Sequence, residues 1–308
     1  ARELAPERLP PQAQTWVNRR LQFTHGYGVA MSAVNEVTPE GLPTLFLQDV
    51  PPRGKIRIER PELYFSEKST DYVIVRNRIP EFSYPKGEEN VYTTYQGKTG
   101  VGLGSRARRL LFAWRFRDLN ILISGAITPR SVILYHRNVR ERVARLAPFL
   151  RLDRDPYIAV ADGRLFWILD AYTHSDRYPY AARHREGFNY LRNSVKAVVD
   201  AYHGTVTLYV ADPADPIIRA YNRIFPGLFR PMAELPPALR SHLRYPQDLF
   251  AVQAEMYRLY HMQDPRVFYN KEDVWILPEE IYIDKPREMT PYYVIMRLPG
   301  TPREEFML

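Results

Sequence analysis

Two aspartates and two histidines follow one another closely near the middle of the chain: Asp170, His174, Asp176 and His184. An imidazole beside a carboxylate can transfer a proton to or from a substrate, and the same groups can bind a metal ion. Loops that follow a rigid element often carry such sites. The set is therefore the candidate acid–base or metal site, and polar surface residues in a turn are the alternative interpretation.

A fifth candidate is His25, which lies in the sequence Thr24-His25-Gly26-Tyr27-Gly28. The paired glycines allow another group to approach closely around the imidazole, because glycine has no side chain to obstruct it. A structural turn is the alternative interpretation of this sequence.

Several common kinds of site are excluded by the sequence. The absence of cysteine removes disulfides, Cys-based zinc sites and thiol nucleophiles. There is no H-E-x-x-H motif and no Gly-x-Ser-x-Gly motif. Gly97-Lys98-Thr99 resembles the end of a phosphate-binding loop, but Tyr92 stands where that loop needs its first glycine. We therefore expect no metal and no cofactor.

The positive charge of the chain is concentrated in residues 98–151. This segment holds 12 basic and two acidic residues, whereas the remainder holds 31 basic and 33 acidic residues. Such a segment favours an anionic partner, such as phospholipid head groups or a cell-wall polymer, and no nucleic-acid-binding motif accompanies it. The candidate anion contacts are Arg106, Arg108, Arg109, Arg137 and Arg140. The alternative is that these arginines are the solvated faces of two structural helices.

Two amphipathic helices are predicted within this basic segment. The first carries an apolar stripe at the spacing of one helical face: Ala107, Leu110, Leu111 and Trp114. Phe112 and Phe116 lie on its opposite face. The second helix carries the stripe Val139, Val143, Leu146, Ala147 and Leu150. We expect both stripes to be buried.

A β-hairpin is the element that must position Asp170 and the residues after it. Asp162-Gly163 supplies the positive φ angles of a type I′ turn between strands at 157–161 and 164–170. The apolar run 165–169 indicates that this hairpin lies deep in the fold.

Helices and short strands alternate irregularly along the rest of the chain. Helices are predicted over 12–23, over 189–203 with Gly204 as its cap, from Asp215-Pro216 onward, and over 247–262. Strands are predicted at 44–47, 55–58, 63–65, 72–76, 205–210, 274–277, 281–283 and 292–298. Without regular βαβ units, this order indicates an α+β fold of mainly antiparallel strands with packed amphipathic helices.

Two parts are predicted, a strand-rich part over 1–128 with one helix at each end and an α+β part over 129–308 around the hairpin at 157–170. The boundary is weakly marked, and a single domain is the alternative. The composition, 45% hydrophobic and 25% charged, is that of a soluble globular protein. Its longest apolar runs have five residues, whereas a membrane-spanning helix needs about twenty. The chain begins at Ala1 rather than at Met, so we expect it to be part of a longer protein.

Several strings of sequence resemble a known family: residues 24–28, 152–157, 170–173, 175–180, 192–198, 243–246 and 292–300. From about Arg19 to its end, the chain resembles the large bacterial and cyanobacterial integral-membrane proteins of uncharacterised protein family number 0182. The resemblance implies several N-terminal membrane spans, absent from this chain, followed by a large extracytoplasmic region to which this chain belongs. No catalytic or binding residues are established for that family, so none is carried over.

These observations predict a non-enzymatic binding or interaction module at the extracytoplasmic face of the cell membrane. Its partners would be its own transmembrane segments and anionic lipid or cell-wall polymer. The alternative is an envelope hydrolase or transferase that uses Asp170, His174, Asp176 and His184. An enzyme would bring these side chains together in one concave pocket, whereas a binding module would present a face or groove.

Overall fold

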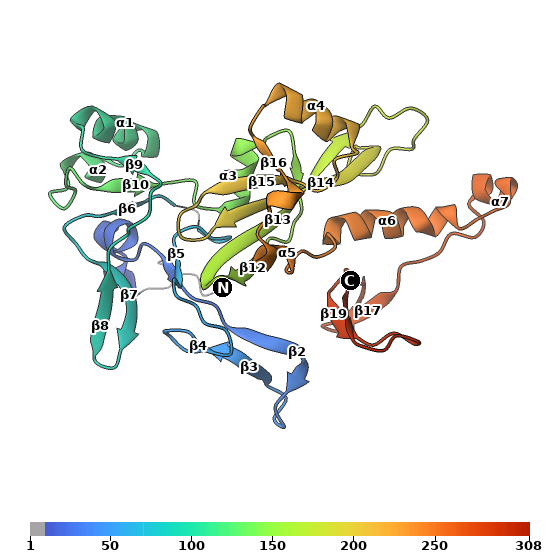
Figure 1. Ribbon diagram of the computed structural model, residues 1–308, viewed down its shortest axis with the longest axis horizontal. Coiled ribbons are helices and arrows are strands. Elements are labelled where there is room, and N and C mark those ends of the chain that lie inside the picture. The colour runs from blue at the N-terminus through green and yellow to red at the C-terminus, as the bar shows by residue number, and fades with distance from the viewer. Residues whose placement is uncertain (1–9, 70) are drawn as a thin grey trace.

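The computed structural model describes residues 10–69 and 71–308 and arranges them in three regions along the longest axis of the molecule (Figure 1). A six-stranded sheet, the central sheet, lies in the middle. The helices α1 (Arg106–Phe116) and α2 (Asn120–Ile123) lie at one end. The last 62 residues, 247–308, extend from the other end and are called the arm below.

The central sheet has the order β11-β13-β14-β15-β16, with β12 paired to β13. Its strands are β11 (Arg151–Leu152), β12 (Tyr157–Ala161), β13 (Arg164–Ser175), β14 (Tyr190–Asp200), β15 (Val206–Val210) and β16 (Phe229–Pro231). All pairs are antiparallel except β15 with β16. The hairpin β12–β13 is confirmed, because Asp162 and Gly163 take φ angles of 49° and 71°, as a type I′ turn requires.

The prediction of a helix over 189–203 is wrong, because β14 occupies most of that range. β14 lies between β13 and β15, and it is buried continuously from Ser194 to Asp200. A strand covered on both faces loses the alternation of apolar and polar residues, so its spacing can match that of a helix by coincidence. The β-branched residues Val195, Val198 and Val199 favour a strand. Gly204, with φ of 69°, turns the chain into β15 instead of capping a helix.

Both faces of the central sheet are covered. The larger core lies on the face of Trp167 and Val199, where α3 (Val139–Leu146) and α4 (Pro216–Ile224) pack. The smaller core joins Ile168 and Val198 on the other face to Leu239 of α5 (Pro237–Arg240). The predicted stripe of α3 is buried, apart from Leu146. The mixture of a mainly antiparallel sheet and packed helices confirms the α+β fold class.

A third core supports the α1–α2 end. It forms around the sheet β6-β10-β9, made of β6 (Val73–Val75), β10 (Val132–Leu134) and β9 (Val101–Gly102). Buried residues of this core come from both sides of residue 128, and the larger core likewise combines Leu63 with Leu134. Both cores therefore combine residues from the two sides of the boundary predicted at 128.

The remaining N-terminal strands form small separate sheets. They are β1 (Gly26–Tyr27) with β5 (Glu62–Leu63), then β2 (Met31–Val37), β3 (Pro43–Gln48) and β4 (Arg53–Gly54), and β7 (Glu81–Lys86) with β8 (Glu89–Thr93). The strands predicted at 44–47 and 72–76 correspond to β3 and β6, whereas 55–58 forms no strand. In place of one helix over 12–23, the chain forms a 3-10 turn at Pro11–Ala13 and the π-helix η3 at Asn18–Gln22.

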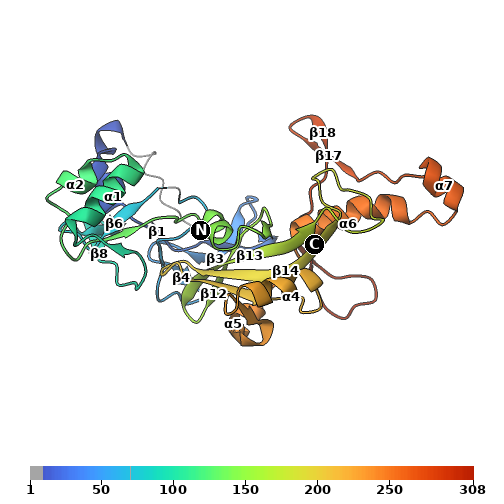
Figure 2. The ribbon, with the colours of Figure 1, turned by 90° about the horizontal axis from the view of Figure 1, so that it is seen from above.

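The arm contains α6 (Gln247–Tyr260), α7 (Pro265–Asn270) and two hairpins, which Figures 1 and 2 show projecting from the sheet. The hairpins are β17 (Glu279–Tyr282) with β18 (Lys285–Glu288), and β19 (Val294–Met296) with β20 (Glu305–Met307). Of the predicted strands, 281–283 and 292–298 overlap β17 and β19, and 274–277 forms none. At its base, the Arg244 guanidinium lies between the rings of Tyr157, at 3.9 Å, and Tyr293, at 4.3 Å.

Candidate functional site

Helix α1 forms where the sequence predicts it, but it is turned so that its predicted core stripe faces solvent. Leu110, Leu111 and Trp114 are 57%, 62% and 81% exposed. The opposite face is the packed one: the ring of Phe116 stacks on Tyr72 with centroids 4.5 Å apart, and Phe112 contacts Tyr135. Both faces of the helix are apolar in sequence, and the aromatic face has ring partners in the third core.

Arg109 fixes this orientation of α1. Its Nε donates a hydrogen bond to the Leu103 carbonyl at 2.8 Å, and its Nη2 donates to the Ile127 carbonyl at 3.2 Å. These carbonyls belong to the segments on either side of α1 and α2. Arg109 therefore acts as an internal tether, and its guanidinium is occupied by backbone rather than available to a ligand.

Helix α2 lies beside α1 and adds three exposed apolar side chains to the same end of the molecule (Figures 1 and 2). Leu119 and Ile123 are more than 70% exposed, and Leu122 is partly exposed. We call these six residues the α1–α2 face: Leu110, Leu111, Trp114, Leu119, Leu122 and Ile123. An exposed cluster of large apolar side chains on a folded protein marks an interaction surface.

Four arginines flank the apolar stripe of α1 at helical spacing: Arg106, Arg108, Arg115 and Arg117. All four are exposed, and no carboxylate among the described residues forms an ion pair with any of them. Arg115 contacts the His136 ring at 3.3 Å and lies over the rings of Phe116 and Tyr135. Arg108 donates a hydrogen bond to the Gly102 carbonyl. An apolar centre with tryptophan and a cationic rim is the composition of surfaces that lie in a membrane interface.

The five arginines that the sequence suggests as anion contacts lie in different environments in the structure. Arg106 and Arg108 lie on the rim of the α1–α2 face, and Arg140 is half-buried near the Arg154 carbonyl. Arg137 requires a correction, because it is buried inside the protein. Its Nε and Nη2 donate hydrogen bonds to backbone carbonyls, and burial lowers its pKa. Arg137 therefore cannot contact a lipid surface.

His25 is sealed in the interior, next to Arg137. The Thr24 hydroxyl donates to Glu81 Oε2 at 2.9 Å, so His25 Nδ1, 3.0 Å away, donates to the Thr24 oxygen. His25 Nε2 is buried without a hydrogen-bond partner, and its ring lies 4.6 Å from the Tyr64 ring. Burial, aided by the charge of Arg137, lowers the pKa of His25 to about 3. A neutral, inaccessible histidine fits the structural turn rather than a catalytic site.

Asp170 is also internal, and its partner was not foreseen. Its carboxylate contacts the Lys196 ammonium across β13 and β14, and Lys196 also donates to the Arg244 carbonyl at 3.2 Å. Burial raises the pKa of Asp170, and the charge of Lys196 acts in the opposite direction. The signal for this pair was a lysine inside the apolar run of β14, which indicates a buried charge that needs a partner.

The other three candidates lie apart from Asp170. His174 and Asp176 are exposed, and Asp176 forms ion pairs with Arg177 and Arg183 at 3.9 and 3.6 Å. His184 Nε2 lies 2.8 Å from Glu255 Oε2 on α6. Among the described residues, no group of three or more His, Asp and Glu side chains is placed to hold a metal ion.

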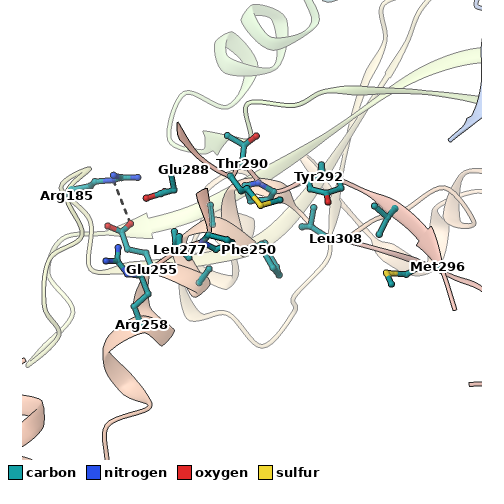
Figure 3. Close-up of a pocket in the computed structure, with 16 residues that line it drawn as sticks. Arg185, Phe250, Glu255, Arg258, Leu277, Glu288, Thr290, Tyr292, Met296 and Leu308 are labelled. Atoms are coloured by element: carbon teal, nitrogen blue, oxygen red, sulfur yellow. Dashed lines mark ion pairs between the residues drawn. The ribbon is translucent and has the colours of Figure 1, made fainter. Parts of the chain in front are cut away.

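An apolar cavity lies between α6 and the segment from Glu288 to Met296, with Arg185 of the body at its edge (Figure 3). Its volume is about 360 Å³, and Arg185 and Glu255 form an ion pair at one end of it. None of its described lining residues is Asp170, His174, Asp176 or His184. The enzyme alternative requires these four residues to converge in one pocket, and they do not converge in this one.

Comparisons with known proteins agree over the full length of the chain. The model of the family described as "Uncharacterised protein family (UPF0182)" matches residues 1–308. A UPF0182 protein of Pelotomaculum thermopropionicum is 53% identical over 310 residues, which cover 100% of this chain and 34% of the relative. One from Cupriavidus necator is 54% identical over 316 residues, which cover 100% of this chain and 35% of the relative.

The chain thus spans about a third of the length of the curated relatives it matches. No solved structure matches it. Within residues 10–69 and 71–308, no helix has the length and apolar character needed to cross a bilayer.

Proposed function

The chain belongs to the uncharacterised protein family UPF0182, and we propose that it is a non-enzymatic binding module that docks on anionic lipid at the extracytoplasmic face of the cell membrane. The α1–α2 face is the docking surface in this proposal. The resemblance to large membrane proteins supports the extracytoplasmic side in this proposal, and the composition of the face supports the lipid contact.

One observation carries the proposal: α1 exposes Leu110, Leu111 and Trp114 while its arginines surround them without acidic partners. In water this arrangement leaves three large apolar side chains unburied. At a membrane interface the apolar side chains enter the acyl boundary, the indole lies at head-group depth, and the guanidinium groups reach the phosphates. Both kinds of group are then satisfied by the same surface.

The magnitudes are sufficient for reversible binding. Full burial of a leucine or isoleucine side chain contributes about 1.5–3 kcal/mol, and each arginine at an anionic surface contributes about 1 kcal/mol. Three apolar anchors and four arginines together contribute about 8–13 kcal/mol. Immobilising the domain costs about 4–15 kcal/mol, so binding is expected to be weak and reversible. The arginine contribution fades within a Debye length, about 8 Å at physiological salt.

Vesicle co-sedimentation tests the proposal. We expect the chain to sediment with phosphatidylglycerol-containing vesicles and to be released progressively by salt, while pure phosphatidylcholine vesicles retain little of it. Changing Leu111 and Trp114 to Gln should abolish binding to both kinds of vesicle. Changing Arg106, Arg108, Arg115 and Arg117 to Gln should remove the preference for anionic lipid.

A matched control separates a local surface from the general positive charge. Four exposed basic residues near the N-terminal hairpins, Arg53, Lys55, Arg57 and Lys86, are changed to Gln, which removes the same charge far from α1. This variant should bind like the unmodified chain. Binding that is absent, or that falls equally in the control, would overturn the proposal.

A further inference from the structure

The chain as a whole exposes far more surface than a compact folded chain of its mass does. A compact monomer of 36.1 kDa exposes about 13,400 Å², whereas this chain exposes 19434 Å². The excess, about 6,000 Å², is comparable to the area that permanent subunit interfaces bury, about 2,000–5,000 Å². The surface therefore has the extent of a lasting interface rather than of a transient contact.

The arm is rich in apolar residues, but none of its side chains is fully buried. Of its 62 residues, 30 are hydrophobic, a larger share than the 45% of the whole chain, and each of the 30 is at least partly exposed. Ile276, Ile281 and Ile283 are each more than 75% exposed. Two-stranded hairpins and single helices are marginally stable in water without a packed face. The arm therefore needs a partner surface to hold the structure it has.

The charge of the arm indicates the kind of surface. The arm carries seven basic and eleven acidic residues, and the remainder of the chain carries 36 basic and 24 acidic residues. The arm is thus net negative and the remainder strongly positive. A second copy of this chain supplies a surface of the opposite charge, and complementary charge selects and orients a partner.

One surface outside the arm has the matching composition. Ile224 and Phe225, at the end of α4, are 62% and 40% exposed. Arg219, Arg223 and Arg230 are exposed around them, and no carboxylate among the described residues forms an ion pair with these three. We call these five residues the α4 face. α4 lies toward the same half of the molecule as the arm (Figure 1).

The β17–β18 hairpin of the arm is its counterpart. Ile281 and Ile283 provide the apolar side chains, and Glu279 and Asp284 are exposed acids that form no ion pair with any described residue. We propose that the hairpin of one copy packs on the α4 face of a second copy, and that the exchange is reciprocal. The result is a two-fold dimer in which the β17–β18 hairpin of each arm is covered by the partner, as closed symmetric assemblies require.

The test is the mass of the purified chain in solution without lipid, measured by light scattering and sedimentation equilibrium. We expect a dimer of twice the 36.1 kDa chain mass. Ile281→Asp with Ile283→Asp should shift it to the monomer mass. A matched control, Leu42→Asp with Leu45→Asp, adds the same charge at exposed apolar positions of the β3 hairpin and should remain dimeric.

Charge reversal identifies the two surfaces. Arg219→Glu with Arg223→Glu should give monomers, and adding Glu279→Arg and Asp284→Arg to that variant should restore the dimer. Restoration occurs only if these residues face one another. A monomer at every soluble concentration would overturn the proposal and would mean that another surface covers the arm, such as further sequence of the longer relatives. A dimer that persists after the charge reversal would overturn it as well.

Discussion

The central sheet and the arm are both rich in apolar residues, but they use them in opposite ways. The sheet buries Trp167 and Val199 on one face and Ile168 and Val198 on the other. The arm leaves Trp275 and Ile276 partly or almost fully exposed. Apolar content alone therefore does not tell which segments form a core. Long strands paired on both sides bury their residues within the chain, whereas short hairpins at the end of a helix present theirs outward.

The largest expected effect is the loss of a tryptophan from the sheet. Trp167→Ala should lower the free energy of unfolding by about 3–5 kcal/mol, because it leaves a cavity in the larger core and removes the hydrogen bond from Nε1 to the Phe65 carbonyl. Trp275→Ala should change the free energy of unfolding by less than about 0.5 kcal/mol. This variant is made in a chain that also carries Ile281→Asp and Ile283→Asp. Urea unfolding followed by circular dichroism measures both. Equal losses would show that the arm belongs to the core.

Ion pairs give a second contrast of the same kind. Lys196→Met leaves the Asp170 carboxylate buried without its counterion, so it should cost about 3–5 kcal/mol of stability. Asp170→Leu combined with Lys196→Met should recover most of that loss. The Glu280–Arg287 pair of the arm, at 2.7 Å, is partly exposed, and Glu280→Gln should cost less than about 1 kcal/mol. A double variant as unstable as the single one would contradict the assignment of the loss to an unpaired charge.

Acid should weaken the folded body through His25. The pKa of His25 is about 3 in the folded protein and about 6.5 in an unfolded chain, so the unfolded state binds the proton first. Above pH 6.5, His25 does not lower the free energy of unfolding. As the pH falls from 6.5 toward 3, this free energy decreases, and the loss due to His25 is about 3 kcal/mol at pH 4. His25→Gln should flatten the dependence of the unfolding free energy on pH over that range. An unchanged slope would place the acid sensitivity elsewhere.

The smallest expected effect comes from substituting two glycines that have similar positive φ angles. Gly163 and Gly300 have φ angles of 71° and 85°, which a β-branched residue resists. Gly163→Val should lower stability by about 1–3 kcal/mol, because it strains the hairpin inside the sheet. Gly300→Val should leave the midpoint of unfolding unchanged, because the strain is confined to the arm. Thermal melts of the two variants provide the measurement.

Local sequence signals were sufficient where the structure is local. Asp162-Gly163 predicts its hairpin because a type I′ turn depends only on those two residues, and Asp215-Pro216 likewise predicts the start of α4. The spacing of β14 predicts a helix, which is wrong, because the position of the strand between two others cannot be read from that spacing. The orientation of α1 was wrong because both of its faces are apolar, and distant rings decide between them.

The candidate site shows the same limit. Asp170 and His184 are candidates in the sequence, but their partners Lys196 and Glu255 come from other elements. Lys196 in an apolar run indicates a buried charge, but the sequence does not tell which carboxylate pairs with it. Arg137 was assigned to the surface from its charge, whereas carbonyls of Thr24 and Tyr64 bind it in the interior. Charge counts along a segment therefore locate a basic region, but they do not tell which of its arginines face outward.

The contact of Arg244 with Tyr157 and Tyr293 belongs to a joint that is polar and aromatic rather than aliphatic. A guanidinium between two rings is attracted to both, and the Asp155 carboxylate holds Arg244 to the body. Asp248 and Glu255 of α6 add polar contacts with Arg154 and His184. The arm is therefore attached to the body mainly by charged and polar groups, so added salt should weaken this attachment more than it weakens the apolar cores.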